Sequence, residues 1–198
     1  MFKGLTAILF ALALAACSQG TPVTGSAWQL NGEASDLTFV SVKNGDVAEV
    51  SRFGAFSGQV DADGNAGLVI NPASVETYVD IRNERLRDIF FNVAEFAEIR
   101  VNTSVAPDLF EDLVAGQSVD TELELSVTLR GTARTVYAPV TVTRAGADRM
   151  LVVSREPALV DVRDFGLEAP VETLRGIAGL NSITPVFPVS AYLVFERA

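Results

Sequence analysis

The chain has 198 residues, with 15 basic and 25 acidic side chains, one cysteine, no histidine and a net charge of −10. Such an acidic chain does not suit nucleic acid, and it lacks the basic excess that adheres to anionic lipid. Without histidine, and with a single cysteine, it cannot build a Ser-His-Asp triad, a Cys-His pair or a metal site made of His and Cys ligands.

The first 16 residues, MFKGLTAILFALALAA, are typical of an export signal. One basic residue precedes an unbroken run of small and apolar residues that is too short to span a bilayer comfortably. The sequence LAAC, Leu14 to Cys17, resembles the bacterial lipobox, in which cleavage falls before the cysteine and its thiol receives lipid, palmitate included. We therefore expect a lipoprotein signal peptide over 1–16 and lipid attachment at Cys17; the alternative is an ordinary secretory signal followed by a spare cysteine.

Residues 17–26 comprise the cysteine and SQGTPVTGS, a small, polar and turn-prone sequence typical of a flexible tether. Acylation would anchor the protein to a membrane without a spanning segment. Ser18, rather than Asp, follows the cysteine, which resembles lipoproteins sorted to the outer membrane. We expect a lipid-anchored protein of the cell envelope, at the outer membrane and facing the periplasm. Residues 27–198 are enough for one domain with a sizeable core.

Downstream of Trp28 the apolar residues recur mostly at every second position, which predicts strands with one buried and one wet face. The first three predicted strands are DLTFVSVK (36–43), GAFSGQVD (54–61) and AGLVIN (66–71). Asp63-Gly64 lies between the second and third strands and predicts a two-residue type I′ turn. The sequence DADGN at this turn superficially resembles a calcium loop, but Ala66 and Pro72 occupy the positions where such a loop needs glycine and glutamate.

The segment 79–99, VDIRNERLRDIFFNVAEFAEI, predicts a helix from Asn83 to Val93. One apolar face has the helical spacing i, i+3, i+4, i+7: Leu86, Ile89, Phe90 and Val93.

The charges of this helix suit an exposed surface, where Glu84 can pair with Arg87 and Arg85 with Asp88. This interpretation does not explain Phe91, which lies off the apolar face and is free to face a cavity, or Arg82, which precedes the helix.

Further along the chain, 119–131 and 132–144 alternate as a pair of strands joined at Gly131, and RMLVVS (149–154) and VFPVSAYLVFE (186–196) predict two more. Short helices are predicted over 107–116 and 169–179, both of which end at glycine. One-sided strands separated by turns predict an all-β fold with a few short helices, either a closed barrel or a sandwich.

Three long segments resemble the YceI-like family: NPASVETYVDIRNERLRDIFFNVAEFAEI, LRGTARTVYAPVTV and VDVRDFGLEA. The resemblance extends from about Trp28 to Phe195. It implies an extended, lipocalin-like antiparallel β-barrel of about eight strands, whose lumen holds a long apolar chain, typically a polyisoprenoid lipid or a similar amphiphile. SVETYVDIRNERLR corresponds to the family pattern SVDTGN..RDEHLR, with Arg85 where histidine is common.

The candidate ligand-binding residues are chosen by residue type, for the barrel that the resemblance implies. The phenylalanines chosen for the lining are Phe39, Phe53, Phe56, Phe90, Phe91 and Phe165, and Arg82 is chosen for the polar end of the ligand. We expect no catalytic residue, metal, cofactor or nucleic-acid partner. Two alternatives stay open: an envelope enzyme with a carboxylate pair in the same cavity, and a barrel with a filled core that binds a partner or is structural. The sequence does not decide between a monomer and a homodimer.

Overall fold

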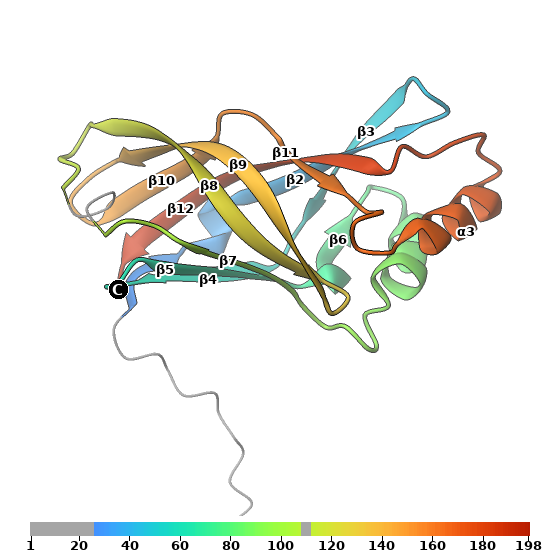
Figure 1. Cartoon of the computed structure of the whole chain (residues 1–198), viewed down its shortest axis with the longest axis horizontal. Coiled ribbons are helices and arrows are strands. Elements are labelled where there is room, and N and C mark those ends of the chain that lie inside the picture. The colour runs from blue at the N-terminus through green and yellow to red at the C-terminus, as the bar shows by residue number, and fades with distance from the viewer. Residues whose placement is uncertain (1–25, 108–111) are drawn as a thin grey trace, which may run out of the picture.

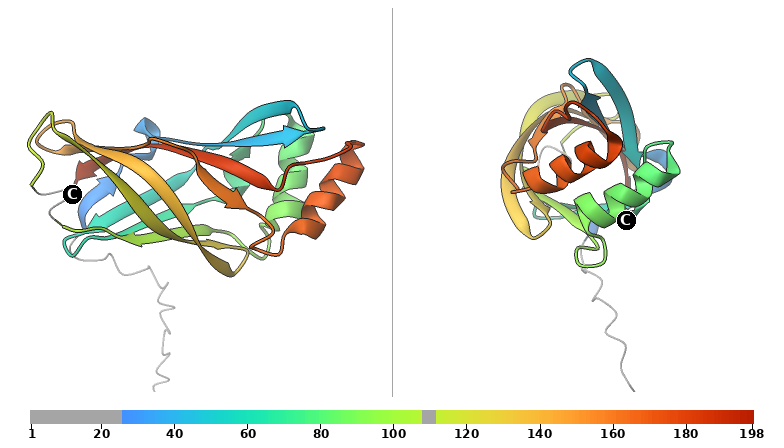
Figure 2. Two further views of the ribbon diagram at one scale, coloured as in Figure 1. Left: turned by 45° about the horizontal axis from the view of Figure 1, so that its top comes forward. Right: turned by 90° about the vertical axis from the view of Figure 1, so that its right-hand side faces the viewer.

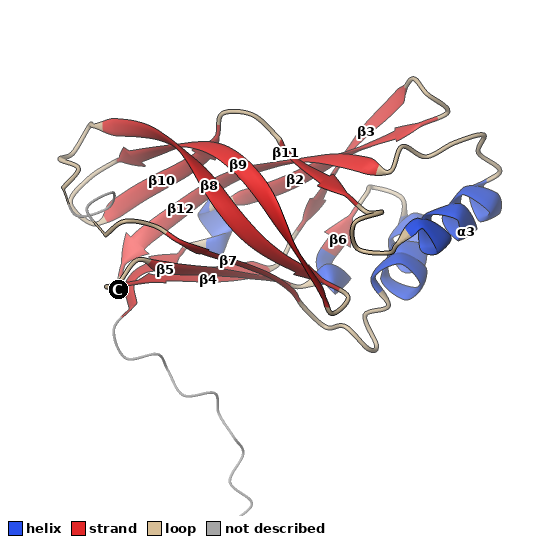
Figure 3. Ribbon diagram, viewed as in Figure 1, coloured by secondary structure: helices blue, strands red, loops and turns tan. Residues whose placement is uncertain are grey.

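The structure is a computed structural model that describes residues 26–107 and 112–198. The predicted signal peptide, the lipid-attachment site Cys17 and the tether as far as residue 25 lie outside the described residues. Strands dominate the described part, and the helices are short (Figure 3). The predicted all-β class is confirmed.

All the strands predicted from the alternation are present, and shorter strands join them. The strands are β1 (Ser26–Leu30), β2 (Asp36–Lys43), β3 (Val47–Phe53), β4 (Phe56–Asp61), β5 (Asn65–Ile70), β6 (Val75–Glu76), β7 (Ile99–Ser104), β8 (Ser118–Leu129), β9 (Thr132–Arg144), β10 (Arg149–Ser154), β11 (Ala158–Asp161) and β12 (Val186–Arg197). The helical segments are η1 (Gly32–Ala34), η2 (Pro72–Ser74), α1 (Asp80–Arg85), η3 (Leu86–Phe91) and α3 (Glu168–Ala178).

Eight of the strands close into an antiparallel barrel. Their order is β1-β4-β5-β7-β8-β9-β10-β12, and β12 pairs again with β1. The register of this last pair joins Trp28 to Arg197 and Leu30 to Phe195. The fold is therefore the barrel rather than the sandwich, as the family resemblance implied.

The sheet continues beyond the closed barrel because β12 changes partners along its length. Its C-terminal half pairs with β10 and β1, whereas its N-terminal half pairs with β11 and β2. β2 in turn pairs with β3, and β3 pairs with β6. α1, η3 and α3 lie at this end, which we call the helix end (Figures 1 and 2). None of the helices within the described ranges is long and apolar enough to cross a membrane.

The opposite end of the barrel is packed around Trp28, whose side chain is 0% exposed. The guanidinium carbons of Arg144 and Arg197 lie 4.7 and 4.8 Å from the centroid of its ring. Cations over an indole face are attracted by the negative potential of the ring. Trp28 is therefore part of the strand pair β1–β12 that closes the barrel, and its ring packs against the side chains of Arg144 and Arg197.

The turn between β8 and β9 is a two-residue connection. Arg130 (φ 47°) and Gly131 (φ 76°) both have positive φ, as a type I′ turn requires. The strand residues on either side, Leu129 and Thr132, are paired. The predicted hairpin at Gly131 is confirmed.

The turn between β4 and β5 differs from its prediction. Residues 62–64 connect these strands, and of the three only Gly64 has positive φ (84°). The Asp61 carboxylate accepts hydrogen bonds from the amides of Asp63 (3.0 Å) and Asn65 (2.8 Å), which begins the turn one residue earlier than predicted. The two-residue type I′ turn at Asp63-Gly64 was thus wrong, although Gly64 is the residue that the turn requires.

The helix predicted from Asn83 to Val93 was partly wrong in its limits and geometry. It begins earlier, at Asp80, and from Leu86 to Phe91 it is π-helical. In a π-helix each amide bonds to the fifth preceding residue, so residues five apart share a face as well as residues four apart.

The other two predicted helices have different outcomes. α3 confirms the helix predicted over 169–179, and it ends at Gly179, whose φ is 64°. Residues 108–111 of the helix predicted over 107–116 lie outside the described residues, and 112–117 form turns and bends.

Candidate functional site

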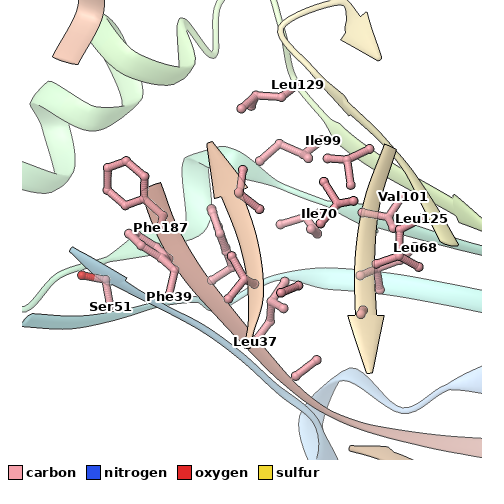
Figure 4. Close-up of a pocket in the computed structure, with 18 of the residues that line it drawn as sticks. Leu37, Phe39, Ser51, Leu68, Ile70, Ile99, Val101, Leu125, Leu129 and Phe187 are labelled. Atoms are coloured by element: carbon pink, nitrogen blue, oxygen red, sulfur yellow. The ribbon is translucent and has the colours of Figure 1, made fainter. Parts of the chain in front are cut away.

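The barrel encloses an apolar cavity of about 530 Å³. Inward-facing side chains of the alternating strands form its wall, among them Leu68 and Ile70 of β5 and Val101 of the adjacent strand β7 (Figure 4). Leu125 and Leu129 of β8 continue this wall. The volume falls within the roughly 300–1,000 Å³ that is usual for sites that hold small molecules.

Five phenylalanines form a closed ring on the cavity wall, with each ring in contact with the next. In order, they are Phe39 of β2, Phe53 of β3, Phe91 and Phe90 of η3, and Phe187 of β12. Neighbouring ring centroids are between 4.9 and 6.5 Å apart, in tilted and edge-to-face arrangements that aromatic pairs favour. This phenylalanine ring joins η3 to the strands of the helix end.

The π-helical geometry of η3 explains the position of Phe91. Leu86 and Phe91, five residues apart, both line the cavity together with Phe90. Phe91 is 5% exposed and contacts Phe53 and Phe90, so it is part of the packed wall, not a side chain outside the apolar face.

The structure places most, but not all, of the candidate ligand-binding residues on the cavity wall. Those that line it are Phe39, Phe53, Phe90, Phe91 and Arg82. Phe56 and Phe165 are not among the lining residues: Phe56 begins β4 and packs against the core, and Phe165 is buried in the turn before α3. Both were chosen for residue type alone, and a buried aromatic serves a core as well as a cavity. A direct contact with ligand stays a prediction for the five lining residues.

Among the wall residues that sequence reasoning did not choose are a further phenylalanine, Phe187, and two further cations, Lys43 and Arg85. Phe187 alternates with Val189 along β12, so the strand pattern could have indicated it. The sequence predicts an ion pair between Arg85 and Asp88 on an exposed surface. Neither that pair nor Glu84–Arg87 is among the ion pairs of the described residues, and Arg87 instead donates to the Val75 carbonyl at 3.5 Å.

A hydrogen-bond network fixes the start of α1 against β6. The side-chain oxygen Oδ1 of the buried Asn83 accepts from the backbone amide (2.8 Å) and the hydroxyl (2.6 Å) of Thr77, and the side-chain Nδ2 of Asn83 donates to the Glu76 carboxylate (3.0 Å). Arg82 donates to the Thr77 hydroxyl (2.9 Å) and the Thr77 carbonyl (2.8 Å). These contacts orient the Arg82 guanidinium at the helix end of the cavity.

Arg82 also pairs with Glu49 of β3, which accepts a second ion pair from Lys43 at 2.6 Å. The hydrogen bond from Lys43, together with the positive charge of Arg82, holds the pKa of Glu49 below its usual range. Glu49 is therefore ionised at neutral pH. It does not line the cavity, so it contacts Lys43 and Arg82 from outside the wall.

These observations bear on the two alternative functions. The interior is not filled, since the cavity occupies it. No aspartate or glutamate of the described residues lines the cavity, so the carboxylate pair needed by the enzyme alternative is not found there. Within the same residues, no group of three acidic side chains is placed to hold a metal ion.

Comparison with known proteins gives matches to one family and to several solved structures. Residues 28–195 match the family model of the YceI-like domain. The structure is similar to that of a polyisoprenoid binding domain from Saccharophagus degradans implicated in plant cell wall breakdown, with 35% identity, a TM-score of 0.85, and coverage of 87% of this chain and 99% of that chain. No curated protein matches the sequence.

Two more distant structures share the fold. BcnA of Burkholderia cenocepacia is 21% identical, with a TM-score of 0.64 and coverage of 83% of this chain and 98% of that chain. The YceI protein of Campylobacter jejuni is 13% identical, with a TM-score of 0.52 and coverage of 75% of this chain and 85% of that chain. The match over 28–195, together with the closed barrel and its internal cavity, shows that the chain belongs to the YceI-like family.

Proposed function

We propose that this protein is an envelope lipoprotein whose barrel binds one long-chain isoprenoid or a similar amphiphilic lipid noncovalently. The observation that supports it best is the apolar cavity of about 530 Å³, in which the charged lining residues, among those that the structure describes, lie at the helix end. The similarity to a polyisoprenoid binding domain supports the isoprenoid class of ligand. Binding involves no bond chemistry.

The physical basis of binding is removal of the lipid chain from water. Burial of apolar surface contributes about 25 cal/mol per Å², from which the loss of motional freedom on association is subtracted. A barrel that is formed before the ligand enters keeps this loss small, because few side chains have to be ordered. A long apolar chain with one polar end thus matches the distribution of polarity along the wall.

Filling the cavity tests this proposal. Native mass spectrometry of the protein extracted from its own membrane is expected to show one lipid per barrel. Ala138 is buried on β9 and lines the cavity, so the ring in Ala138→Phe occupies the lipid's space, and the variant is expected to lose at least about nine-tenths of the lipid, a tenfold loss equal to about 1.4 kcal/mol. Ala133→Phe is the matched control, since Ala133 lies on the same strand but is exposed.

The two variants distinguish a cavity ligand from adhering lipid. Ala133→Phe should retain lipid at the level of the unchanged protein, with both variants folded by circular dichroism. If Ala138→Phe retains as much lipid as Ala133→Phe, the lipid is outside the barrel and the proposed function is wrong. Failure of the unchanged protein to retain or take up any long-chain lipid has the same consequence.

Anchoring is tested separately at Cys17. Cys17→Ser removes the thiol that LAAC presents for acylation, so the protein is expected to move from the membrane fraction to the soluble envelope fraction. The barrel should stay folded, because Cys17 precedes the described domain. Cell fractionation with a high-salt wash measures the change. A Cys17→Ser protein that remains with the membrane would contradict the lipoprotein assignment.

A further inference from the structure

The charged side chains that line the cavity all have the same sign. They are Lys43, Arg82 and Arg85, and no acidic side chain of the described residues accompanies them on the wall. This contrasts with the chain as a whole, whose net charge is −10. The selection of cations for the wall therefore does not reflect the composition of the protein.

The three cations lie together at the helix end. Lys43 ends β2 and is bridged to Ile183, in the segment between α3 and β12. Arg82 and Arg85 lie three residues apart on α1, which places them on one side of the helix. α1 continues directly into η3, whose Phe90 and Phe91 belong to the phenylalanine ring. The cationic group is thus adjacent to the apolar interior.

The positive charge is only partly balanced by protein groups. Glu49 is the single carboxylate in salt-bridge contact with these cations among the described residues, and Lys43 and Arg82 share it. Arg85 has no carboxylate within salt-bridge distance in that part of the chain. Three cations with one carboxylate leave an excess of two positive charges at the end of an apolar cavity.

We propose that this cationic group selects an amphiphile with an anionic oxyacid head, a phosphate or a carboxylate, and that Arg85 is its specificity-determining residue. The proposal rests on the proposed function and names the head of the same ligand. A guanidinium presents parallel N–H donors that match phosphate and carboxylate oxygens. An apolar wall lowers the local dielectric constant, which strengthens the attraction between the head and the cations relative to water.

Arg85 differs from Lys43 and Arg82 in how much of its hydrogen-bonding capacity is available to a ligand. Arg82 is held by Thr77 and Glu49, and Lys43 is held by Glu49, so both have part of their hydrogen-bonding capacity in use. Arg85 is half-buried and lines the cavity without a carboxylate partner among the described residues. A half-buried cation without a counter-ion is stabilised by an anion that the ligand brings.

The experiment compares heads on the same apolar chain. Geranylgeranyl phosphate is measured against geranylgeraniol, and a long-chain fatty acid against its alcohol, by displacement of a fluorescent lipid below the micelle concentration. The unchanged protein is expected to bind at least one anion about tenfold or more tightly than its alcohol. Arg85→Gln should reduce this preference to about threefold or less, because the anionic head loses a charged partner that the alcohol never had.

Two further variants control for charge and for folding. Arg134→Gln makes the same change at an exposed position of β9 that does not line the cavity, so the preference should persist. Arg85→Lys keeps the positive charge and should retain most of the preference for the anion. Part of the preference is lost, because an ammonium lacks the parallel N–H donors of a guanidinium. Thermal melting of each variant confirms that the compared proteins are folded.

The outcomes separate the anionic head, the role of Arg85 and lipid binding by the barrel from one another. Preference for the phosphate alone, or for the carboxylate alone, identifies the source of the anion. Equal binding of anion and alcohol in both pairs by the unchanged protein overturns the anionic head while lipid binding by the barrel stands. A preference that Arg85→Gln leaves intact removes Arg85 as its determinant. If none of the four lipids binds, the proposed function itself has failed.

Discussion

Trp28→Ala is expected to lower the free energy of unfolding by about 4–5 kcal/mol, at the upper end of the range for truncation of a buried aromatic. Trp28 is fully buried in the strand that closes the barrel, where it pairs with β12 and β4. Alanine leaves a void there and removes the ring that Arg144 and Arg197 contact. Urea unfolding followed by circular dichroism measures the change, since Trp28 is the only tryptophan and its fluorescence is lost in the variant.

Trp28→Phe serves as the control for this prediction. It keeps an aromatic ring over which the two guanidinium groups can lie, and it removes less volume, so a loss of about 1–2 kcal/mol is expected. A Trp28→Ala protein destabilised by less than about 2 kcal/mol would mean that the barrel closes without this side chain.

Gly64→Val is expected to destabilise the protein by about 3 kcal/mol or more, for two additive reasons. Gly64 has a φ of 84°, a conformation that a β-branched residue adopts only with strain. A β-carbon at this position would lie 1.9 Å from the carbonyl oxygen of Val105, so the backbone itself has to move. That movement disturbs the hydrogen bond from the Val105 amide to the Gly64 carbonyl, which is 2.9 Å long.

Gly45→Val is the control that separates the backbone strain of a positive φ from the collision with the Val105 carbonyl. Gly45 has nearly the same φ, 87°, but no atom beyond its two chain neighbours lies within 4 Å of the position of its β-carbon. It is therefore expected to show the strain alone, about 1–2 kcal/mol. The comparison is made from urea midpoints at equal slope. Equal losses in the two variants would show that the loop containing Val105 moves away without cost.

The alternation of apolar and polar residues predicted β2, β4, β5, β8, β9, β10 and β12 within a few residues of their limits. This succeeded because each strand has one wet face and one buried face, a local property that repeats every second residue. The turn at Gly131 was equally local, since a two-residue hairpin needs positive φ at both positions. Composition alone also excluded histidine- and thiol-based chemistry.

Helix geometry was less accessible to sequence reasoning. Apolar residues spaced three and four apart do not show whether a helix is α-helical or π-helical. The π-helical geometry of η3 places Phe91 on the face that lines the cavity. The expected surface ion pairs are not formed, because Arg85 lines the cavity and Arg87 donates to the Val75 carbonyl. The hydrogen bond from Arg87 to Val75 of β6 is a tertiary contact, which the sequence of the helix does not show.

By itself, the sequence determined the all-β class, most of the strands, the acidic net charge and the family to which its motifs are similar. Only the tertiary structure decided that β1 meets β12 to close a barrel, that Phe187 lines the cavity whereas Phe165 does not, and that three cations gather at one end. The reason is physical. Periodicity shows that a side chain points inward, but the curvature of the closed sheet sets whether it meets another side chain or an open cavity.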